Sequence, residues 1–163
     1  MRALQRFNEF LVTVGSWGTI LFMVVIALVI PYEVIGRYVF QKMSMWSGEV
    51  STYSLVWASM LGGAVGLKKG YMIRMTTVLE SVPEKVVKFL KFLSYICALI
   101  FFGAMFGYGL FQTLYNAKQT SPAIGLVMSY PYAALPTGFF IMFFLTMEEL
   151  LTFLGMGQKG SVQ

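Results

Sequence analysis

Side chains able to carry chemistry are scarce in this sequence, and their types exclude most kinds of catalysis. There is no histidine and one cysteine, Cys97, which lies inside an apolar run. Disulfide frameworks need paired cysteines, and zinc sites and Cys–His nucleophiles need histidine or several thiols. The remaining acidic side chains are seven glutamates: Glu9, Glu33, Glu49, Glu80, Glu84, Glu148 and Glu149. We therefore expect no catalytic residue, no metal site and no bound cofactor in this chain.

The positions of the glutamates also argue against autonomous transport. Each lies beside an apolar run or in a polar segment, so each is expected at a helix end or in a loop. A proton-coupled or cation-coupled carrier needs an ionisable group or a broken helix near the centre of the bilayer. The sequence therefore predicts that this chain does not transport a substrate alone.

The composition predicts which kind of secondary structure positions the glutamates and Cys97. Of 163 residues, 58% are hydrophobic, 17% aromatic and 12% charged, and the mean hydropathy is +0.73. Soluble domains are about 25% charged, so this chain has too few polar side chains to cover a globule in water. We predict an all-α integral membrane protein, because about 20 apolar residues per crossing allow several spanning helices in this length.

Charged residues divide most of the chain into four uncharged runs that are 18 to 29 residues long. A helix rises about 1.5 Å per residue, so each run can cross the hydrocarbon layer of about 30 Å. Pro136 falls in the fourth run, where a kink is expected because proline lacks an N–H. The predicted transmembrane helices lie near 10–30, 50–68, 92–117 and 130–149, in a single four-helix membrane domain of residues 1–155 that a flexible C-terminal tail, 156–163, follows.

Short interfacial amphipathic helices are expected beside these spans. In the segment 32–41, Glu33, Arg37 and Gln41 recur at i+4 steps opposite an apolar face, which is typical of an amphipathic helix. That helix either extends the first span or lies separately in the interface. The segment Ser81-Val82-Pro83-Glu84 has the pattern of a capping box, so a helix is expected to begin there and to run into the third span.

The lysine and arginine residues predict the orientation. Nine of the 12 lie in the N-terminal segment, the 68–91 loop and the C-terminal tail, and three lie in the segments on the opposite side. Loops rich in lysine and arginine stay in the cytoplasm, so both termini and the 68–91 loop are expected there. Contact with anionic membrane lipids accounts for the net charge of +5 without nucleic acid. The residues expected to anchor the chain at this surface are Lys68, Lys69, Lys85 and Lys88.

Small residues recur at a spacing that favours helix packing. They are Ala58, Gly62 and Gly66 in the second span, Gly103 and Gly107 in the third, and Ala134 and Gly138 in the fourth. Such spacing lets helix backbones approach closely in lipid. Packing within the chain and packing against another subunit both fit the pattern.

Two expectations concern individual side chains. Cys97 lies one turn into the third span with no charged neighbour, so it is expected to be a small buried hydrophobe. Arg37 and Glu49 are expected at the same edge of the membrane, in one polar cluster that Glu33 joins.

Several ordered motifs resemble one family of membrane subunits. They are Ile35-Gly36-Arg37-Tyr38-Val39-Phe40, Trp46-Ser47-Gly48-Glu49-Val50, Trp57 and Leu61-Gly62-Gly63-Ala64-Val65-Gly66-Leu67-Lys68-Lys69-Gly70, with weaker support from residues 130–138. Together they are similar to the small membrane subunit of tripartite ATP-independent periplasmic (TRAP) transporters, the DctQ-like family. The resemblance covers about residues 10–83.

The resemblance implies a role within an assembly. Members pair with a large TRAP membrane subunit that carries substrate and sodium by an elevator motion, while a periplasmic substrate-binding protein delivers an organic acid of the sialic acid or C4-dicarboxylate type. This chain would be a non-catalytic scaffold in the bacterial inner membrane that holds the large subunit and helps to dock the binding protein. The residues implied in subunit packing are Arg37, Trp46, Glu49, Trp57, Gly62, Gly63 and Gly66.

Two other functions stay open at this point. One is a self-contained four-helix carrier or channel that forms a homo-oligomer, and the other is a small membrane-bound regulator without a transport role. A large hydrophobic subunit encoded beside a secreted solute-binding protein would favour the scaffold. Flux through this chain alone would favour the carrier.

Overall fold

The computed structural model describes residues 2–41, 44–68, 70 and 84–155. Their regular structure is helical, apart from one isolated β-bridge between Thr120 and Val127. Lys69, residues 81–83 of the expected capping box and the expected tail 156–163 lie outside the described residues. The same holds for the side chain of Lys85, although its backbone belongs to a described helix.

Among the described residues, four helices are long and apolar enough to cross a membrane. They are α1 (Arg2–Tyr38), α2 (Met45–Lys68), α4 (Glu84–Tyr115) and α6 (Ala134–Phe153), and the short helices η1 (Asn116–Lys118) and α5 (Ser129–Tyr132) lie between the last two. This confirms the predicted all-α membrane protein with four spans. The helices α1, α2 and α4 are longer than the predicted spans, because charged residues mark the edge of the hydrocarbon layer and not the end of a helix.

The expected amphipathic helix of residues 32–41 is the continuation of α1. Pro31 lies inside this helix, which runs on to Tyr38 without a break. Proline costs the helix one hydrogen bond, and a membrane helix tolerates this loss when neighbours satisfy the freed carbonyl. The 37 residues of α1 extend about 55 Å, which exceeds the hydrocarbon thickness of about 30 Å. Part of α1 must therefore lie in the headgroup layer or tilt strongly.

The expected kink near Pro136 is a break one turn before it. The helix α5 ends at Tyr132 and α6 begins at Ala134. Pro136 has no N–H to donate to the Tyr132 carbonyl, whereas Thr137 N donates to Ala133 O at 3.2 Å. A Cβ on Gly109 of α4 would lie 3.0 Å from Pro136, so glycine lets the two helices approach at this break.

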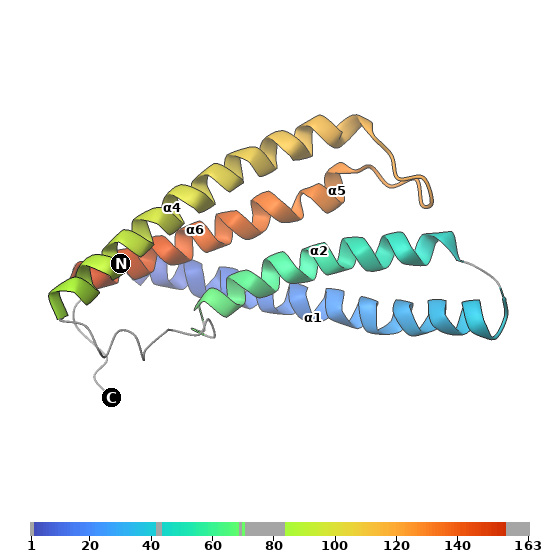
Figure 1. Ribbon diagram of the computed structural model, residues 1–163, viewed down its shortest axis with the longest axis horizontal. Helices are drawn as coiled ribbons and strands as arrows, with labels where there is room; N and C mark the ends of the chain where they lie inside the picture. Colours follow the sequence, from blue (N-terminus) through green and yellow to red (C-terminus); the bar gives the residue numbers. More distant parts are fainter. Residues whose placement is uncertain (1, 42–43, 69, 71–83, 156–163) are drawn as a thin grey trace.

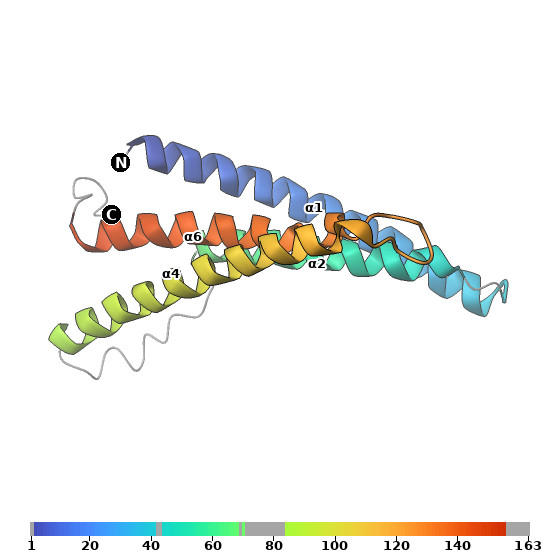
Figure 2. The same cartoon turned by 90° about the horizontal axis from the view of Figure 1, so that it is seen from above.

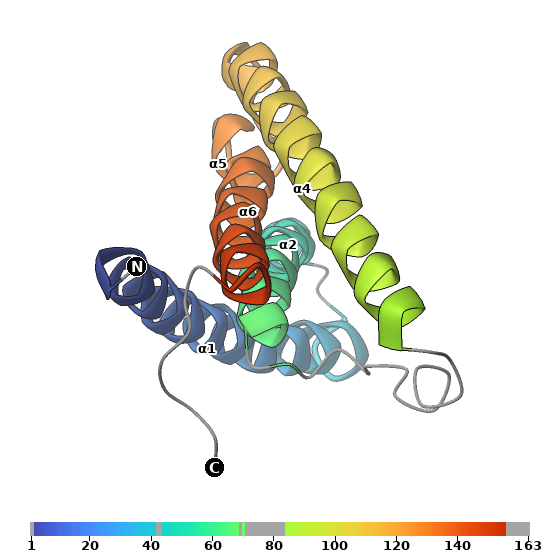
Figure 3. The same ribbon diagram turned by 90° about the vertical axis from the view of Figure 1, so that its left-hand side faces the viewer.

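The helices form two hairpins joined through their central members (Figure 1). In each hairpin an outer helix packs on an inner one: α1 on α2, and α4 on α6. The buried core lies between α2 and α6 and contains Leu61, Ala64, Ile141 and Leu145. Figure 2 and Figure 3 show α1 and α4 on opposite sides of α6, diverging toward the start of α1. We call the end with the α1–α2 connection and residues 119–128 the loop end, and the other the terminal end.

The outer helices expose apolar side chains over most of their surface. In the most apolar stretch of α1 and of α4 no residue is buried, whereas half of the corresponding stretch of the span Ser129–Phe153, which comprises α5 and α6, is buried. Cys97 lies on the exposed surface of α4, so the expectation that it is buried within the chain is wrong. The sequence pattern could not distinguish the two faces of α4, because both are apolar. The surfaces of α1 and α4 are therefore available to lipid or to another subunit.

Candidate scaffold and packing sites

Glu49 fastens the loop that connects α4 to α5. Its carboxylate accepts a hydrogen bond from the Ser121 hydroxyl and further bonds from the backbone N–H groups of Ala123, at 3.1 Å, and Ile124, at 3.3 Å. Ser121 is only 3% exposed. One carboxylate of α2 thus satisfies three donors of a loop that is more than 70 residues away in the sequence.

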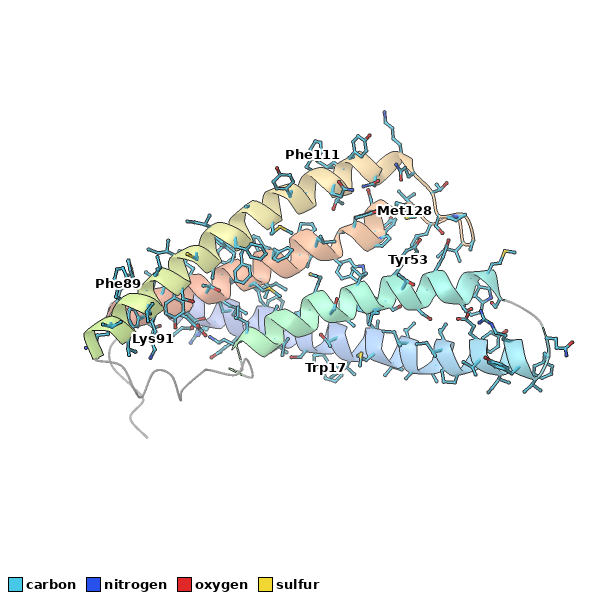
Figure 4. All side chains as sticks on the ribbon, in the orientation of Figure 1. Trp17, Tyr53, Phe89, Lys91, Phe111 and Met128 are labelled. Carbon is cyan, nitrogen blue, oxygen red and sulfur yellow. The ribbon has the colours of Figure 1, made fainter. Side chains whose placement is uncertain are left out.

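The loop that Glu49 holds has its own hydrogen bonds. Ser121 N donates to Leu126 O at 2.8 Å, and Met128 N donates to Gln119 O at 2.9 Å. Gly125 turns the chain with a φ of +67°, a conformation that side-chain-bearing residues rarely adopt. Tyr53 of α2 and Met128 point toward one another, with 3.5 Å between hydroxyl and sulfur (Figure 4). The loop is therefore tied to α2 at two places.

Arg37 and Glu49 belong to separate interactions, so the expected single polar cluster is wrong. Arg37 pairs with Glu33 one turn earlier, at 3.7 Å, as their i, i+4 spacing on the helix allows, and the Arg37 side chain is 51% exposed. Trp46 instead packs its ring on Tyr32 of α1, with 5.7 Å between centroids. The sequence places all these residues near one membrane edge but does not determine which way each helix face points.

Trp57 joins three helices. Its ring stacks on Phe22 of α1 at 5.6 Å and 20°, and its indole N–H donates to Tyr130 O of α5 at 3.1 Å. A tryptophan can make both contacts because it combines a large apolar ring with one donor. The motif analysis selected Trp57 but predicted neither contact: Tyr130 was noted only as part of the motif of residues 130–138, and Phe22 belongs to no motif.

The glycine face of α2 divides between contacts within the chain and an open surface. A Cβ on Gly62 would lie 3.4 Å from the Thr19 methyl of α1, and one on Gly63 would lie 2.9 Å from the Met142 methyl of α6. No described atom lies within 4 Å of a Cβ placed on Gly66. Gly138 of α6 also approaches α2 closely, since its Cβ would lie 2.8 Å from Met60 Cβ and 3.3 Å from Met60 O. The spacing rule selected Gly62, Gly66 and Gly138 alike, because it does not specify what faces them.

A polar cluster of Asn8, Lys68 and Glu148 joins α1, α2 and α6 near the terminal end. Glu148 accepts from Lys68 Nζ at 2.7 Å and from Asn8 Nδ2 at 2.6 Å. Asn8 also donates to Phe144 O at 3.2 Å and is fully buried, yet Asn8 Oδ1 has no partner among the described residues. We expected Lys68 to contact headgroups, but the structure gives it a partner inside the chain.

Sequence reasoning missed most of this cluster. Asn8 was not considered, although an uncharged polar residue beside a long apolar run could have drawn attention to it. Glu148 was expected at a helix end, but α6 continues to Phe153 and only 12% of the Glu148 side chain is exposed. Among the other expected anchors, Lys88 lies on α4 and has an interaction partner.

Comparison with known proteins determines the family. The model of the family described as "Tripartite ATP-independent periplasmic transporters, DctQ component" matches residues 26–155. The chain belongs to the DctQ family. This match confirms the family inferred from the motifs between residues 35 and 70. It includes Trp46, Glu49, Trp57, the α2 glycines and Glu148 of this DctQ-family chain, and it begins after Asn8.

The relatives include a small permease protein and two longer permease proteins. The chain is 24% identical over 132 residues to the sialic acid TRAP transporter small permease protein SiaQ of Vibrio cholerae, covering 81% of this chain and 76% of the relative. It is 27% identical over 140 residues to the isethionate TRAP transporter permease protein DctMQ of Oleidesulfovibrio alaskensis, covering 78% and 21%. It is 26% identical over 149 residues to the sialic acid TRAP transporter permease protein SiaT of Haemophilus influenzae, covering 88% and 22%. This DctQ-family chain thus spans about a fifth of the two longer relatives.

Proposed function

We propose that this multi-pass membrane protein is the small, non-catalytic scaffold subunit of a TRAP transporter. One observation carries the proposal: the polar groups of Glu49, Trp57 and the Lys68–Glu148 pair all bind other segments of the same chain. These groups hold the helices together. Groups that transport a solute must instead face a water-accessible path through the membrane.

The proposed partner is a large membrane subunit that carries the moving substrate site. Two longer relatives support this pairing. The chain covers only about a fifth of each, so most of each relative lies beyond the matched region. The open apolar faces of α1 and α4 provide surface for the partner. Gly66, where an added Cβ would meet no described side chain or neighbouring helix within 4 Å, is a site where a partner helix could approach closely.

The finer parts of the proposal concern the transported solute and its delivery. The names of the relatives include sialic acid and isethionate, which supports an organic acid. We propose that a sodium gradient drives its import, that sodium binds to the large subunit, and that a periplasmic binding protein docks at the loop end. The loop fastened by Glu49 offers a defined surface for that docking.

We further propose that the chain lies in the bacterial inner membrane with both termini in the cytoplasm. The distribution of lysine and arginine supports this orientation, since nine of 12 lie in the N-terminal segment, the 68–91 loop and the C-terminal tail. The loop end then faces the periplasm, where the binding protein would be found.

Reconstitution in liposomes tests the function. The samples are this chain alone, this chain with its large partner, and both with the binding protein, each under an inward sodium gradient. We expect uptake of the organic acid only in the third sample. Uptake or ion flux with the lone chain would refute the scaffold and favour the homo-oligomeric carrier or channel. A control sample contains the large partner and the binding protein without this chain, and full uptake in that control would favour a regulator.

A further inference from the structure

The exposed residues of α2 form one line of mostly small side chains along the helix. Beyond Trp46, the exposed positions of α2 are Gly48, Thr52, Leu55 and Ser59, and Gly66 continues the line two turns later. These residues recur every three, four or seven positions, so they share one face of the helix. We call this face the α2 stripe. Other faces of α2 pack on α1 and on α6 (Figure 3).

The α2 stripe lies at the depth of the hydrocarbon layer but lacks the side chains that usually face lipid. The uncharged run between Glu49 and Lys68 has 18 residues, which is about 27 Å, and Ser59 lies at its middle. Large apolar side chains favour contact with lipid. The helix α1 exposes such side chains at the same spacing, at Phe10, Val14, Trp17, Leu21, Val24 and Leu28. The α2 stripe has only one, Leu55.

The polarity of α2 as a whole gives independent support. The most apolar stretch of α2 has a lower mean hydropathy than that of α1 or α4, and is similar in this respect to the span Ser129–Phe153. Half of the residues are buried in the corresponding stretch of Ser129–Phe153, but only 22% are buried in that of α2. The helix α2 thus has the polarity of a half-buried span with less than half of its burial. We therefore expect α2 to be covered by a partner that the described chain does not supply.

The hydroxyl groups of the α2 stripe are already hydrogen-bonded within the helix. Thr52 Oγ1 donates to Gly48 O at 2.8 Å, and Ser59 Oγ donates to Val56 O at 2.9 Å. Such bonds satisfy serine and threonine in a membrane helix without a polar ligand. A Cβ added to Gly48 or Gly66 would meet no described side chain or neighbouring helix within 4 Å. The α2 stripe therefore suits the close approach of an apolar helix and not the binding of a solute.

We propose that one transmembrane helix of the large membrane subunit packs on the α2 stripe, with its backbone close to Ser59 and Gly66. This inference rests on the pairing proposed above and names the face that makes the closest contact. The two longer relatives, most of whose length lies beyond the matched region, favour a large subunit over a second copy of this chain. The spacing of the stripe favours a helix crossing of about 20°. On α4, exposed large side chains such as Tyr108 and Phe111 keep a neighbouring backbone farther away.

The affinity of the full chain for the large subunit tests the face. Both subunits are purified in mixed micelles, and the Kd is measured by energy transfer between fluorophores on their termini. Ser59→Leu fills the middle of the α2 stripe and should raise the Kd about tenfold or more. The matched control Ser59→Ala keeps the side chain small, and it should change the Kd by less than about twofold because the hydroxyl bonds only to its own helix. An unchanged Kd for Ser59→Leu would overturn the proposal.

Two further measurements exclude a trivial loss of binding. The lone Ser59→Leu chain should keep its near-UV circular dichroism spectrum, because an exposed leucine faces lipid when the partner is absent. Loss of that spectrum would show that Ser59 packs within the chain and would overturn the proposal. Gly107→Leu on α4, where an added Cβ meets no described side chain or neighbouring helix within 4 Å, should change the Kd by less than about twofold. If Gly107→Leu weakens binding as much as Ser59→Leu does, α4 makes the closest contact and the proposal is wrong.

Photocrosslinking in the co-expressed complex identifies the occupant. A small diazirine amino acid replaces Thr52, and mass spectrometry identifies the crosslinked product. We expect a crosslink to one helix of the large subunit. A crosslink to a second copy of this chain, or to phospholipid alone, would overturn the proposal.

The same measurements separate this proposal from the scaffold function on which it rests. If the unmodified chain does not bind the large subunit, the pairing fails and the proposed face fails with it. If the unmodified chain binds and Ser59→Leu binds equally well, the pairing stands and only the face is wrong.

Discussion

Removing the Glu148 carboxylate with Glu148→Ala should destabilise the bundle near its terminal end. This carboxylate accepts from Lys68 Nζ at 2.7 Å and from Asn8 Nδ2 at 2.6 Å, and only 12% of the Glu148 side chain is exposed. The substitution leaves the Lys68 side chain, which is 29% exposed, without its counter-charge. It also removes one of the two acceptors of the fully buried Asn8 amide.

The expected loss follows from the exposure of each partner. Breaking a fully buried ion pair costs about 3–5 kcal/mol. Lys68 is partly exposed and can turn its ammonium toward headgroups or water, which lowers this cost. Asn8 keeps its bond to Phe144 O at 3.2 Å, so it loses one hydrogen bond, a contribution of about 1 kcal/mol. We therefore expect Glu148→Ala to lower the free energy of unfolding by about 2–3 kcal/mol.

Equilibrium unfolding of the purified chain in mixed detergent micelles, followed by near-UV circular dichroism, measures this loss. The matched control is Glu9→Ala, because the Glu9 side chain is exposed and has no partner among the described residues. It should change the free energy of unfolding by less than about 0.5 kcal/mol. The double variant Lys68→Met/Glu148→Met should recover most of the stability, because an apolar pair of similar volume avoids the desolvation of both charges.

Two results would refute this reasoning. The first is a Glu148→Ala variant as stable as the Glu9→Ala control, which would mean that the carboxylate is solvated and its contacts contribute little. The second is a double variant whose loss equals or exceeds the summed losses of its two single variants. That result would show that packing at these positions, and not the charge pair, determines the stability.

Three further predictions concern the loop end, helix packing and orientation. Glu49→Ala should increase the rate of amide hydrogen exchange in the loop of residues 119–128, by about tenfold or more, because three donors lose their acceptor. Unchanged exchange would show that the hydrogen bonds within the loop are sufficient to order it. Gly138→Leu should lower the recovery of folded chain, since overpacking costs about 1–3 kcal/mol; Gly66→Leu should leave the lone chain stable and reduce only co-purification of the large subunit. Single cysteines at Gly70 and Thr120 in a cysteine-free background should differ in labelling by an impermeant thiol reagent in intact cells, with reaction at 120 alone; reaction at 70 alone would reverse the orientation.

Some details of structure were predictable because they are local along the chain. The pairing of Glu33 with Arg37 depends only on the helical repeat, and the structure has it at 3.7 Å. The break before Pro136 follows from the missing N–H of one residue, although its position one turn earlier required the structure.

Other expectations were wrong because they depended on the rotation of helices about their axes. Cys97 lies in an apolar run whichever way α4 faces, and only the packing of α4 on α6 leaves it exposed. Gly62 and Gly66 share one spacing rule, but α1 approaches only Gly62 among the described contacts. A pattern of residue types specifies a face, whereas a contact requires the neighbouring helix as well.

The sequence alone determined that this protein is a four-span membrane protein of the DctQ type. Hydrophobicity and charge act residue by residue, so the length of each apolar run is sufficient to predict a crossing. Only the tertiary structure decided that Glu49 holds a loop more than 70 residues away, and that Asn8 and Glu148, separated by 140 residues, close the terminal end. Such contacts depend on how the packed helices are aligned and rotated relative to one another, and the local sequence does not specify that alignment or rotation.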